Sequence, residues 1–313
     1  MYKLFQNRVA VALMATFWGV SAQAAPSGHE WTGILSASIG NDDNLTLDDD
    51  TSAVPSEVDD DYLELLASAS RYISGVRNDG FRVNGTLFTR NYDSVSAFDF
   101  TLLGAGIGYD KTFSNWKTRF DAGYDYITFG SETYQEVAKL GIEGRRRLSK
   151  KTELRLRYEA NFIDAGKDFT NLDGTRQYVR AETRIKQGKN RYRLSYTYET
   201  NARDDRRTAT TFSSASPNRH IIRANARIPF AGKWQAEIDA RYRVSKYRDR
   251  NVFSDSSTQT RKDDRFRSRL GLEYNLTKET KLFGRYDYLD NDSNIDSRSY
   301  DRDLISIGAQ LIF

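Results

Sequence analysis

The chain contains no cysteine, so disulfide bonds, thiolate metal sites and cysteine nucleophiles are all excluded. Histidine is almost absent, with His29 and His220 the only two, which argues against a histidine-dependent hydrolase. Proline is scarce, at 4 of 313 residues, and after residue 25 no apolar run is long enough for a transmembrane helix. Aromatic residues are plentiful by contrast, at 13%, whereas disordered chains are poor in them. The composition therefore indicates an ordered chain.

The first 24 residues have the three parts of a secretory signal peptide. Lys3 and Arg8 give a positive start, residues 9–20 (VAVALMATFWGV) an apolar core, and residues 22–24 (AQA) a small-residue cleavage site. We expect a cleaved signal peptide over residues 1–24, a short periplasmic stub over 25–30 and a single barrel over 31–313. An uncleaved anchoring helix is the alternative, although the apolar core is short for one. Cleavage would remove Lys3 and Arg8 and lower the formal net charge from +4 to +2.

The remaining sequence alternates apolar and polar residues, which is the period of a β-strand. The runs predict fourteen strands, near residues 31–40, 62–74, 81–91, 99–111, 116–128, 134–147, 152–163, 175–186, 191–200, 219–229, 234–247, 264–275, 281–289 and 301–313. Short turns rich in Gly, Asn and Lys join one set of strand ends, at 75–80, 113–116, 148–152, 187–190, 230–234 and 276–280. Longer polar loops join the other set, at about 41–60, 92–98, 129–133, 164–174, 201–218, 249–262 and 290–300.

Short turns at one end, long loops at the other and an even strand count are typical of an outer-membrane barrel. The predicted fold class is therefore all-β: a transmembrane antiparallel up-and-down β-barrel with short periplasmic turns and long extracellular loops. A soluble β-sandwich also alternates, but it lacks this regular rhythm of turn lengths. In a membrane barrel the apolar face, for example Ile238 and Tyr242, turns to lipid, and the charged face, for example Asp239 and Arg241, turns to the lumen.

Aromatic residues support the same assignment of faces. Trp31, Trp116 and Trp234 each open a strand next to a short turn or the N-terminus. We expect all three at one rim, where interfacial tryptophan collects. At the opposite rim we place Phe98, Phe129, Tyr134 and Phe162.

Parity also places many arginines on the lumen face. The predicted pore-lining set is Arg119, Arg145, Arg155, Arg157, Arg180, Arg184, Arg193, Arg223, Arg227, Arg241, Arg243, Arg265, Arg267, Arg269 and Arg285. One interpretation is an electropositive pore that favours anions, and the other is a ladder of arginine–carboxylate pairs that braces a water-filled interior. The run RFRSR (265–269) favours a basic stripe, which the neighbouring arginines would join across the sheet.

The first outer loop is acidic, and one later loop holds the only arrangement that resembles a catalytic site. Asp42, Asp43, Asp48, Asp49, Asp50, Asp59, Asp60 and Asp61 gather near the first loop, where a cation could bind, although a solvated loop is the simpler interpretation. A Ser/His/Asp site can be drawn from His220, the serines at 213, 214 and 216, and Asp204 or Asp205. Loop serines are common, so we expect no enzyme activity, no cofactor, no metal and no nucleic-acid-binding module.

Two stretches carry a family resemblance. Residues 39–47 (IGNDDNLTL) and 299–313 (SYDRDLISIGAQLIF) resemble the opening and the last strand of the barrel domain of surface lipoprotein assembly modifiers. The resemblance implies a fourteen-strand barrel. Those proteins usually carry a periplasmic helical-repeat domain before the barrel, and only a few residues precede the first strand here. Barrels associated with exopolysaccharide export are similar in size. The terminal Phe313 resembles the C-terminal signal that the outer-membrane assembly machinery recognises.

We therefore expect an outer-membrane protein of a Gram-negative cell with both termini in the periplasm. Its expected partners are outer-membrane lipids and lipopolysaccharide, the assembly machinery and a periplasmic export partner. The predicted function is a channel that passes or exports an anionic solute or a polymer such as acidic polysaccharide. The alternatives are a barrel that translocates or displays a protein or lipoprotein with a partner, and a closed structural barrel whose loops bind ligands.

Overall fold

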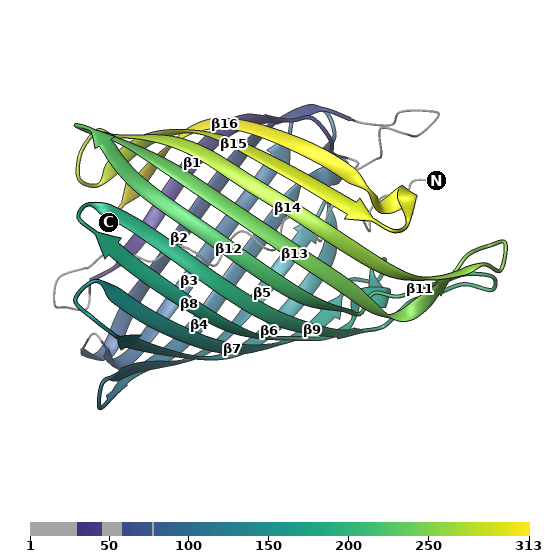
Figure 1. Ribbon diagram of the computed structural model, residues 1–313, viewed down its shortest axis with the longest axis horizontal. Helices are drawn as coiled ribbons and strands as arrows, with labels where there is room; N and C mark the ends of the chain where they lie inside the picture. The colour runs from purple at the N-terminus through teal and green to yellow at the C-terminus, as the bar shows by residue number, and fades with distance from the viewer. Residues whose placement is uncertain (1–29, 46–57, 77) are drawn as a thin grey trace.

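The computed structural model describes residues 30–45, 58–76 and 78–313. The predicted signal peptide, stub residues 25–29 and Asp48–Asp50 lie outside these ranges. Within them the chain forms a single antiparallel sheet that closes into a barrel (Figure 1). Two of its sixteen strands, β10 (Arg206–Arg207) and β11 (Phe212–Ser213), are a small hairpin in one loop, and the other fourteen form the barrel. The predicted number of barrel strands is confirmed.

The barrel strands run alternately between the two ends. Seven lead from the short-turn end to the long-loop end: β1 (Thr32–Asp42), β3 (Asp79–Tyr92), β5 (Trp116–Phe129), β7 (Thr152–Ala165), β9 (Asn190–Arg203), β13 (Trp234–Val252) and β15 (Thr280–Ser293). Seven return: β2 (Asp60–Val76), β4 (Phe100–Phe113), β6 (Glu132–Arg147), β8 (Gly174–Gln187), β12 (Pro217–Ala231), β14 (Thr258–Asn275) and β16 (Tyr300–Ile312). One-turn 3₁₀ helices, η1 (Ser96–Phe98), η2 (Thr170–Leu172) and η3 (Asp296–Arg298), occupy three of the loops. In the described ranges no helix has the length and apolarity needed to cross a membrane.

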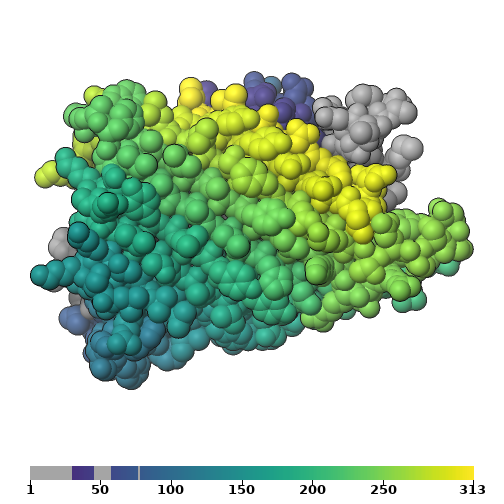
Figure 2. All heavy atoms as spheres, in the orientation of Figure 1, coloured from purple at the N-terminus to yellow at the C-terminus, as the bar shows by residue number. Residues whose placement is uncertain are grey.

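The loops at the long-loop end are shorter than expected in two places. Residues 130–131 alone join β5 to β6, because both strands extend into the predicted loop 129–133. The predicted loop 249–262 is mostly strand: β13 and β14 continue to residues 252 and 258 as a hairpin that projects past the rim (Figures 1 and 2). Almost every side chain of residues 249–262 is polar, so the segment lacks the apolar–polar alternation of the other strands and resembles a solvated loop in the sequence.

The apolar parity faces outward, as predicted. Leu140, Ile238, Ile305 and Ile307 are 55%, 45%, 60% and 60% exposed, respectively. At the short-turn end Phe113 lies opposite Trp116 in register, and Ala231 opposite Trp234. Those tryptophans therefore share one rim. An apolar outer surface of this extent is unfavourable in water and is the expected surface of a lipid-embedded barrel.

β1 and β16 close the barrel. Their register runs from Ile34 opposite Ile312 to Asp42 opposite Leu304, so no strand edge remains open between the two ends of the chain. At the long-loop end of this seam Arg302 donates to Asp42, with Nε 2.6 Å from Oδ1. The Tyr92 hydroxyl donates to the same carboxylate at 2.8 Å. Both charged side chains are almost fully buried. This ion pair therefore ties the last strand to the first.

Replacing Arg302 by Gln should lower the free energy of unfolding by about 3–5 kcal/mol, because Asp42 would keep a buried charge without its partner. The matched control is Lys111→Gln, which breaks the exposed Lys111–Asp79 pair and should cost less than about 1 kcal/mol. Urea unfolding of the barrel in lipid vesicles, followed by tryptophan fluorescence, measures both. Equal losses for the two variants would contradict the role of this ion pair.

Candidate functional site

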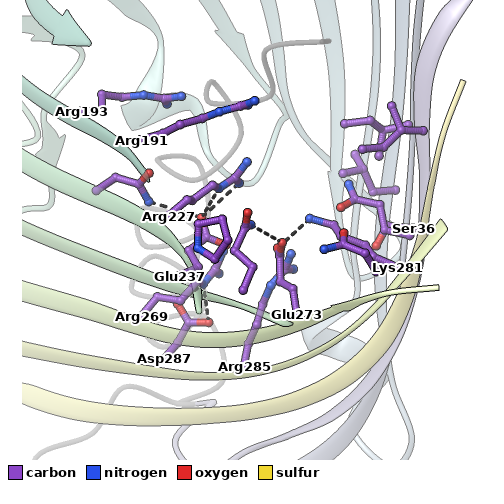
Figure 3. Close-up of a pocket in the computed structure, with 18 of the residues that line it drawn as sticks. Ser36, Arg191, Arg193, Arg227, Glu237, Arg269, Glu273, Lys281, Arg285 and Asp287 are labelled. Atoms are coloured by element: carbon purple, nitrogen blue, oxygen red, sulfur yellow. Dashed lines mark hydrogen bonds and ion pairs between the residues drawn. The ribbon is translucent and has the colours of Figure 1, made fainter. Parts of the chain in front are cut away.

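The interior of the barrel contains a cavity of about 550 Å³, called the basic cavity below (Figure 3). Its walls come from β1–β3, β8, β9 and β12–β16, and turn residues Gly188, Lys189 and Lys278 place one end of it at the short-turn rim. Thirteen lining residues are basic: Arg90, Lys186, Lys189, Arg191, Arg193, Arg223, Arg227, Arg267, Arg269, Lys278, Lys281, Arg285 and Arg302. Four are acidic: Glu64, Glu237, Glu273 and Asp287. The lining therefore carries a strong excess of positive charge.

Ion pairs neutralise part of this charge. The four carboxylates bind basic neighbours in the lining: Glu64 binds Arg90, Glu237 binds Arg227, Glu273 binds Lys281, and Asp287 binds both Arg267 and Arg269 at 2.7 and 2.9 Å. Carboxylates outside the lining reach Arg223 and Arg302. Arg193 lies 3.8 Å from Glu182, which also binds Arg184. Arg285 has no carboxylate partner among the described residues, and its guanidinium stacks 3.9 Å from the Phe283 ring centroid.

The fifteen arginines predicted for the lumen fall into four groups. Six line the basic cavity: Arg193, Arg223, Arg227, Arg267, Arg269 and Arg285. Five pair with carboxylates elsewhere: Arg119, Arg145, Arg155, Arg157 and Arg184. Arg180 donates to the Thr197 hydroxyl at 3.1 Å. Arg241, Arg243 and Arg265 lie at adjacent in-register positions of β13 and β14. A role of these residues in conduction remains a prediction.

Seven of the basic cavity residues lie outside the predicted pore-lining list: Arg90, Lys186, Lys189, Arg191, Lys278, Lys281 and Arg302. Strand parity predicts that Arg90, Lys186 and Arg191 face the lumen, and the other four were missed. Lys189 and Lys278 belong to the short turns QGKN and LTKET. The sequence could have predicted that these two lysines lie together at one mouth of the lumen, because all short turns of a barrel lie at one rim.

The wall formed by β3–β7 is braced by a ladder of ion pairs. Asp121 on β5 binds Arg82 on β3 and Arg157 on β7, the latter at 3.2 Å. Each arginine crosses the intervening strand at a glycine. A Cβ on Gly108 would lie 3.0 Å from Arg82 Nε, and one on Gly141 would lie 2.9 Å from Arg157 Nη2. The arginine–carboxylate ladder that the sequence left as an alternative is thus present on this side of the interior.

A cluster of buried apolar side chains, called the apolar layer below, lines part of the interior toward the long-loop end. Its buried members come from β3–β7, the loop that follows β7, β15 and β16: Phe88, Phe100, Ile127, Phe129, Tyr134, Val137, Ile163, Ala165, Phe169, Leu289 and Tyr300. β1 and β2 lie between β16 and β3 in the wall, and Leu66 of β2 packs against the layer, so the layer follows the wall from β15 round to β7. Leu289 also lines the basic cavity, as does Arg90, two residues beyond Phe88 on the inward face of β3, so the cavity and the layer lie side by side there.

The apolar layer corrects part of the predicted outer aromatic rim. Phe129 and Tyr134 are only 2% and 1% exposed and point inward, and Phe98 packs against them. Phe162, at 50% exposed, faces outward as expected. Phe129 shares the parity of inward-facing Asp125, and an irregularity in the β5–β6 register buries Tyr134 and Gln135 together. Strict alternation in the sequence fails at such a bulge.

The other candidate chemistries have structural explanations. Asp60 accepts backbone N–H groups of Ser94 and Val95 at 2.8 and 2.9 Å. The part of the chain that the structure describes contains no group of three or more residues that fits a metal ion. His220 Nδ1 lies 2.8 Å from the Tyr196 hydroxyl, and the Ser216 hydroxyl donates to the Arg203 carbonyl. No serine–histidine–aspartate relay is formed by these described residues.

Comparisons with known proteins support the architecture. A family model described as "Putative beta-barrel porin 2" matches residues 246–313, from the end of β13 to the C-terminus. Among curated proteins no sequence matches the chain significantly. An anion-selective porin from Comamonas acidovorans is similar in structure, with a TM-score of 0.50 and 12% identity over 92% of this chain and 100% of that one. The outer membrane channel DcaP of Acinetobacter baumannii gives 0.52 and 9% over 94% and 99%.

The chain has the fold of an outer-membrane porin. At these identities the likeness concerns the fold alone, and the predicted fold class is confirmed by it. The resemblance to surface lipoprotein assembly modifiers stays a prediction.

Replacing Phe88 by Ala should open the apolar layer, because removal of this fully buried ring would leave a void next to the basic cavity, which Arg90 lines two residues further along β3. We expect the free energy of unfolding to fall by about 3–5 kcal/mol and the single-channel conductance in planar bilayers to rise. The control is Phe81→Ala on the outward face of the same strand, which should not alter conductance. A destabilised Phe88→Ala barrel with unchanged conductance would place the apolar layer outside the ion path.

Proposed function

We propose that this chain is an outer-membrane channel that favours anionic solutes through its basic lumen. The observation that supports the proposal is the composition of the basic cavity, with thirteen basic against four acidic lining residues. Because protein walls focus electric field lines, such an excess raises the local concentration of anions and repels cations.

The excess is built into the sheet by the arrangement of the strands. In the wall of β3–β7, Arg82 and Arg157 pair with a carboxylate. Most of the basic residues that line the cavity come instead from β8, β9 and β12–β16. Arginine presents several N–H donors in a fixed plane and stays charged at all physiological pH values. It therefore suits carboxylate or phosphate groups of passing solutes, including those of an acidic polysaccharide.

We place the short turns and both chain ends in the periplasm and the long loops outside the cell, as in bacterial outer-membrane barrels. Figure 1 marks the C-terminus at the short-turn end. In this orientation the basic cavity opens to the periplasm and the apolar layer lies toward the exterior. Outer-membrane lipid and lipopolysaccharide would surround the apolar outer face, and the assembly machinery would recognise the last strand.

The apolar layer favours a second candidate function, a barrel that stays closed until a periplasmic partner opens it. Such a barrel would export a polymer, or translocate a protein or lipoprotein, only with that partner present. Fully buried apolar side chains on the inward faces of β3 and β6, such as Phe88 and Tyr134, support this alternative because an apolar lining opposes the passage of hydrated ions.

The reversal potential under a KCl gradient in planar bilayers tests the channel. The wild type should conduct with preference for chloride, and Arg193→Gln with Arg285→Gln should move the reversal potential toward that of an unselective pore. These two changes remove positive charge without leaving any cavity carboxylate unpaired. Lys111→Gln, at the exposed outer surface, is the control and should leave selectivity unchanged. Cation preference in the wild type would refute the proposal, and silence would favour the partner-dependent barrel.

Replacing outward-facing leucines by arginine at two depths of the barrel tests its insertion in a membrane. Leu140 near the middle of β6 and Leu148 in a short turn are both 55% exposed. Leu140→Arg should destabilise the barrel by about 2–4 kcal/mol, and Leu148→Arg by about 0–1 kcal/mol, because the cost of arginine falls from the bilayer midplane to the interface. Unfolding from vesicles measures the difference, and equal costs would contradict the proposed position of the membrane.

A further inference from the structure

Three hydrogen-bond donors without partners meet on one part of the interior wall. Arg243 and Ser245 lie two residues apart on the inward face of β13. Ser245 is opposite Arg219 of β12 in register, and Arg243 is opposite Arg265 of β14. We call these four residues the arginine cluster. Arg243 and Ser245 are 5% and 1% exposed.

The unmet donors of the cluster are the Arg243 Nε, the Ser245 hydroxyl and the Arg219 Nε, each buried without a hydrogen-bond partner among the described residues. The other half of the Arg219 fork binds Glu199 at 2.6 Å. Arg265 donates to Asn291 at 2.8 Å and to the Tyr300 hydroxyl, both neutral groups. The cluster thus holds three guanidinium groups, and the carboxylate that forms an ion pair with one of them is Glu199.

The next acidic neighbour is already occupied. Asp263 of β14 lies opposite Ser245 in register. Its oxygens accept from Arg261 at 2.7 Å and from the Ser293 hydroxyl at 2.8 Å. Its oxygens therefore hydrogen-bond to residues outside the cluster, and its charge reaches Arg243 and Arg219 only through space.

This arrangement is unfavourable unless an anion joins it. A buried guanidinium without a counter-charge carries a large desolvation cost, and like charges directly opposite on neighbouring strands repel. Groups of oxygen acceptors remove both penalties, because arginine forks bind carboxylates and phosphates bidentately and a hydroxyl adds a further donor.

We propose that the arginine cluster is a binding site for the oxyanion group, carboxylate or phosphate, of a solute in the lumen. Arg243 supplies the central charge, Arg219 and Arg265 flank it, and Ser245 donates the neutral hydrogen bond. The inference rests on the proposed function, since the lumen is the route by which a solute reaches the cluster.

The register shows how the cluster connects to the basic cavity. One row across the sheet places Arg241 between Arg223 and Arg267, and those two line the cavity. Arg243 lies two residues further along β13 on the same face. A solute anion in the cavity therefore meets a first row of arginines and then the cluster, which makes the cluster the deeper of two successive binding positions.

The test is the thermal unfolding midpoint of the purified full-length barrel in detergent, titrated with inorganic phosphate or with acetate at constant ionic strength set by chloride. The wild-type midpoint should rise saturably with phosphate, with acetate, or with both. The preferred anion identifies the oxyanion source, and chloride alone should give no saturable rise.

Arg243→Met removes the charge and the donors while keeping the length of the side chain. We expect it to need about tenfold or more phosphate or acetate for a half-maximal shift, since a hydrogen bond to a charged group contributes about 1.5–3 kcal/mol. In chloride alone the variant should be no less stable than the wild type, because a buried unpaired charge has gone. A merely structural arginine would lose stability under every condition.

Ser245→Ala is a milder second variant that keeps all charges, and it should weaken the response to the anion. Lys111→Gln, which lies outside both the basic cavity and the cluster, is the control and should retain the full response. A wild type whose midpoint is unaffected by both anions, or an Arg243→Met response equal to that of the wild type, would overturn the site.

Bilayer selectivity separates this inference from the channel proposal. An anion-selective barrel that shows no anion-dependent stabilisation would overturn the site and keep the channel. A silent or cation-selective barrel that is stabilised through Arg243 would overturn the channel and keep the site.

Discussion

Lipid offers no hydrogen-bond partner to a backbone amide, so each strand of a membrane barrel must find its partners in the two strands beside it. Here that requirement is met by the pairing of β1 with β16, which removes the last open edge. The buried pair between Asp42 and Arg302 lies at the end of this seam, where the first loop leaves the wall. Every inward or outward assignment of a side chain depends on that closure, because it separates an inside from an outside.

Closure also explains why so hydrophilic a chain can have an apolar exterior. The apolar half of each strand lies outside, and charged side chains such as Asp121, Arg157 and Asp287 lie inside. Charges confined in this way must be paired, hydrated or bound to solute. In the wall of β3–β7 the charges are paired: Asp121 binds two arginines, and glycines on the intervening strands leave room for those arginine side chains. The opposite wall keeps an excess of arginine.

Along the barrel axis the interior is divided into unlike parts. The basic cavity runs from the short-turn rim as far as Arg90 and Arg302, and the apolar layer lies beside it toward the long-loop end. The arginine cluster is set in the wall of β12–β14 beyond the first row of cavity arginines. Charged and apolar surfaces thus lie next to each other inside one barrel, so the part of the interior that binds an anion is distinct from the part that is lined by apolar side chains.

The sequence by itself determined the strand count, the two faces of each strand and the identity of the short turns, because alternation and turn chemistry are local properties. It also indicated that Arg265 and Arg267 would meet Arg241 and Arg243, which the register of β13 and β14 shows. Only the tertiary structure decided which arginines are neutralised, since Arg82 and Arg157 find Asp121 across intervening strands. It alone revealed the apolar layer, because members of that layer such as Phe88 and Leu289 are far apart in sequence. A bulge at Tyr134 also breaks the alternation from which the inward position of that side chain could have been predicted.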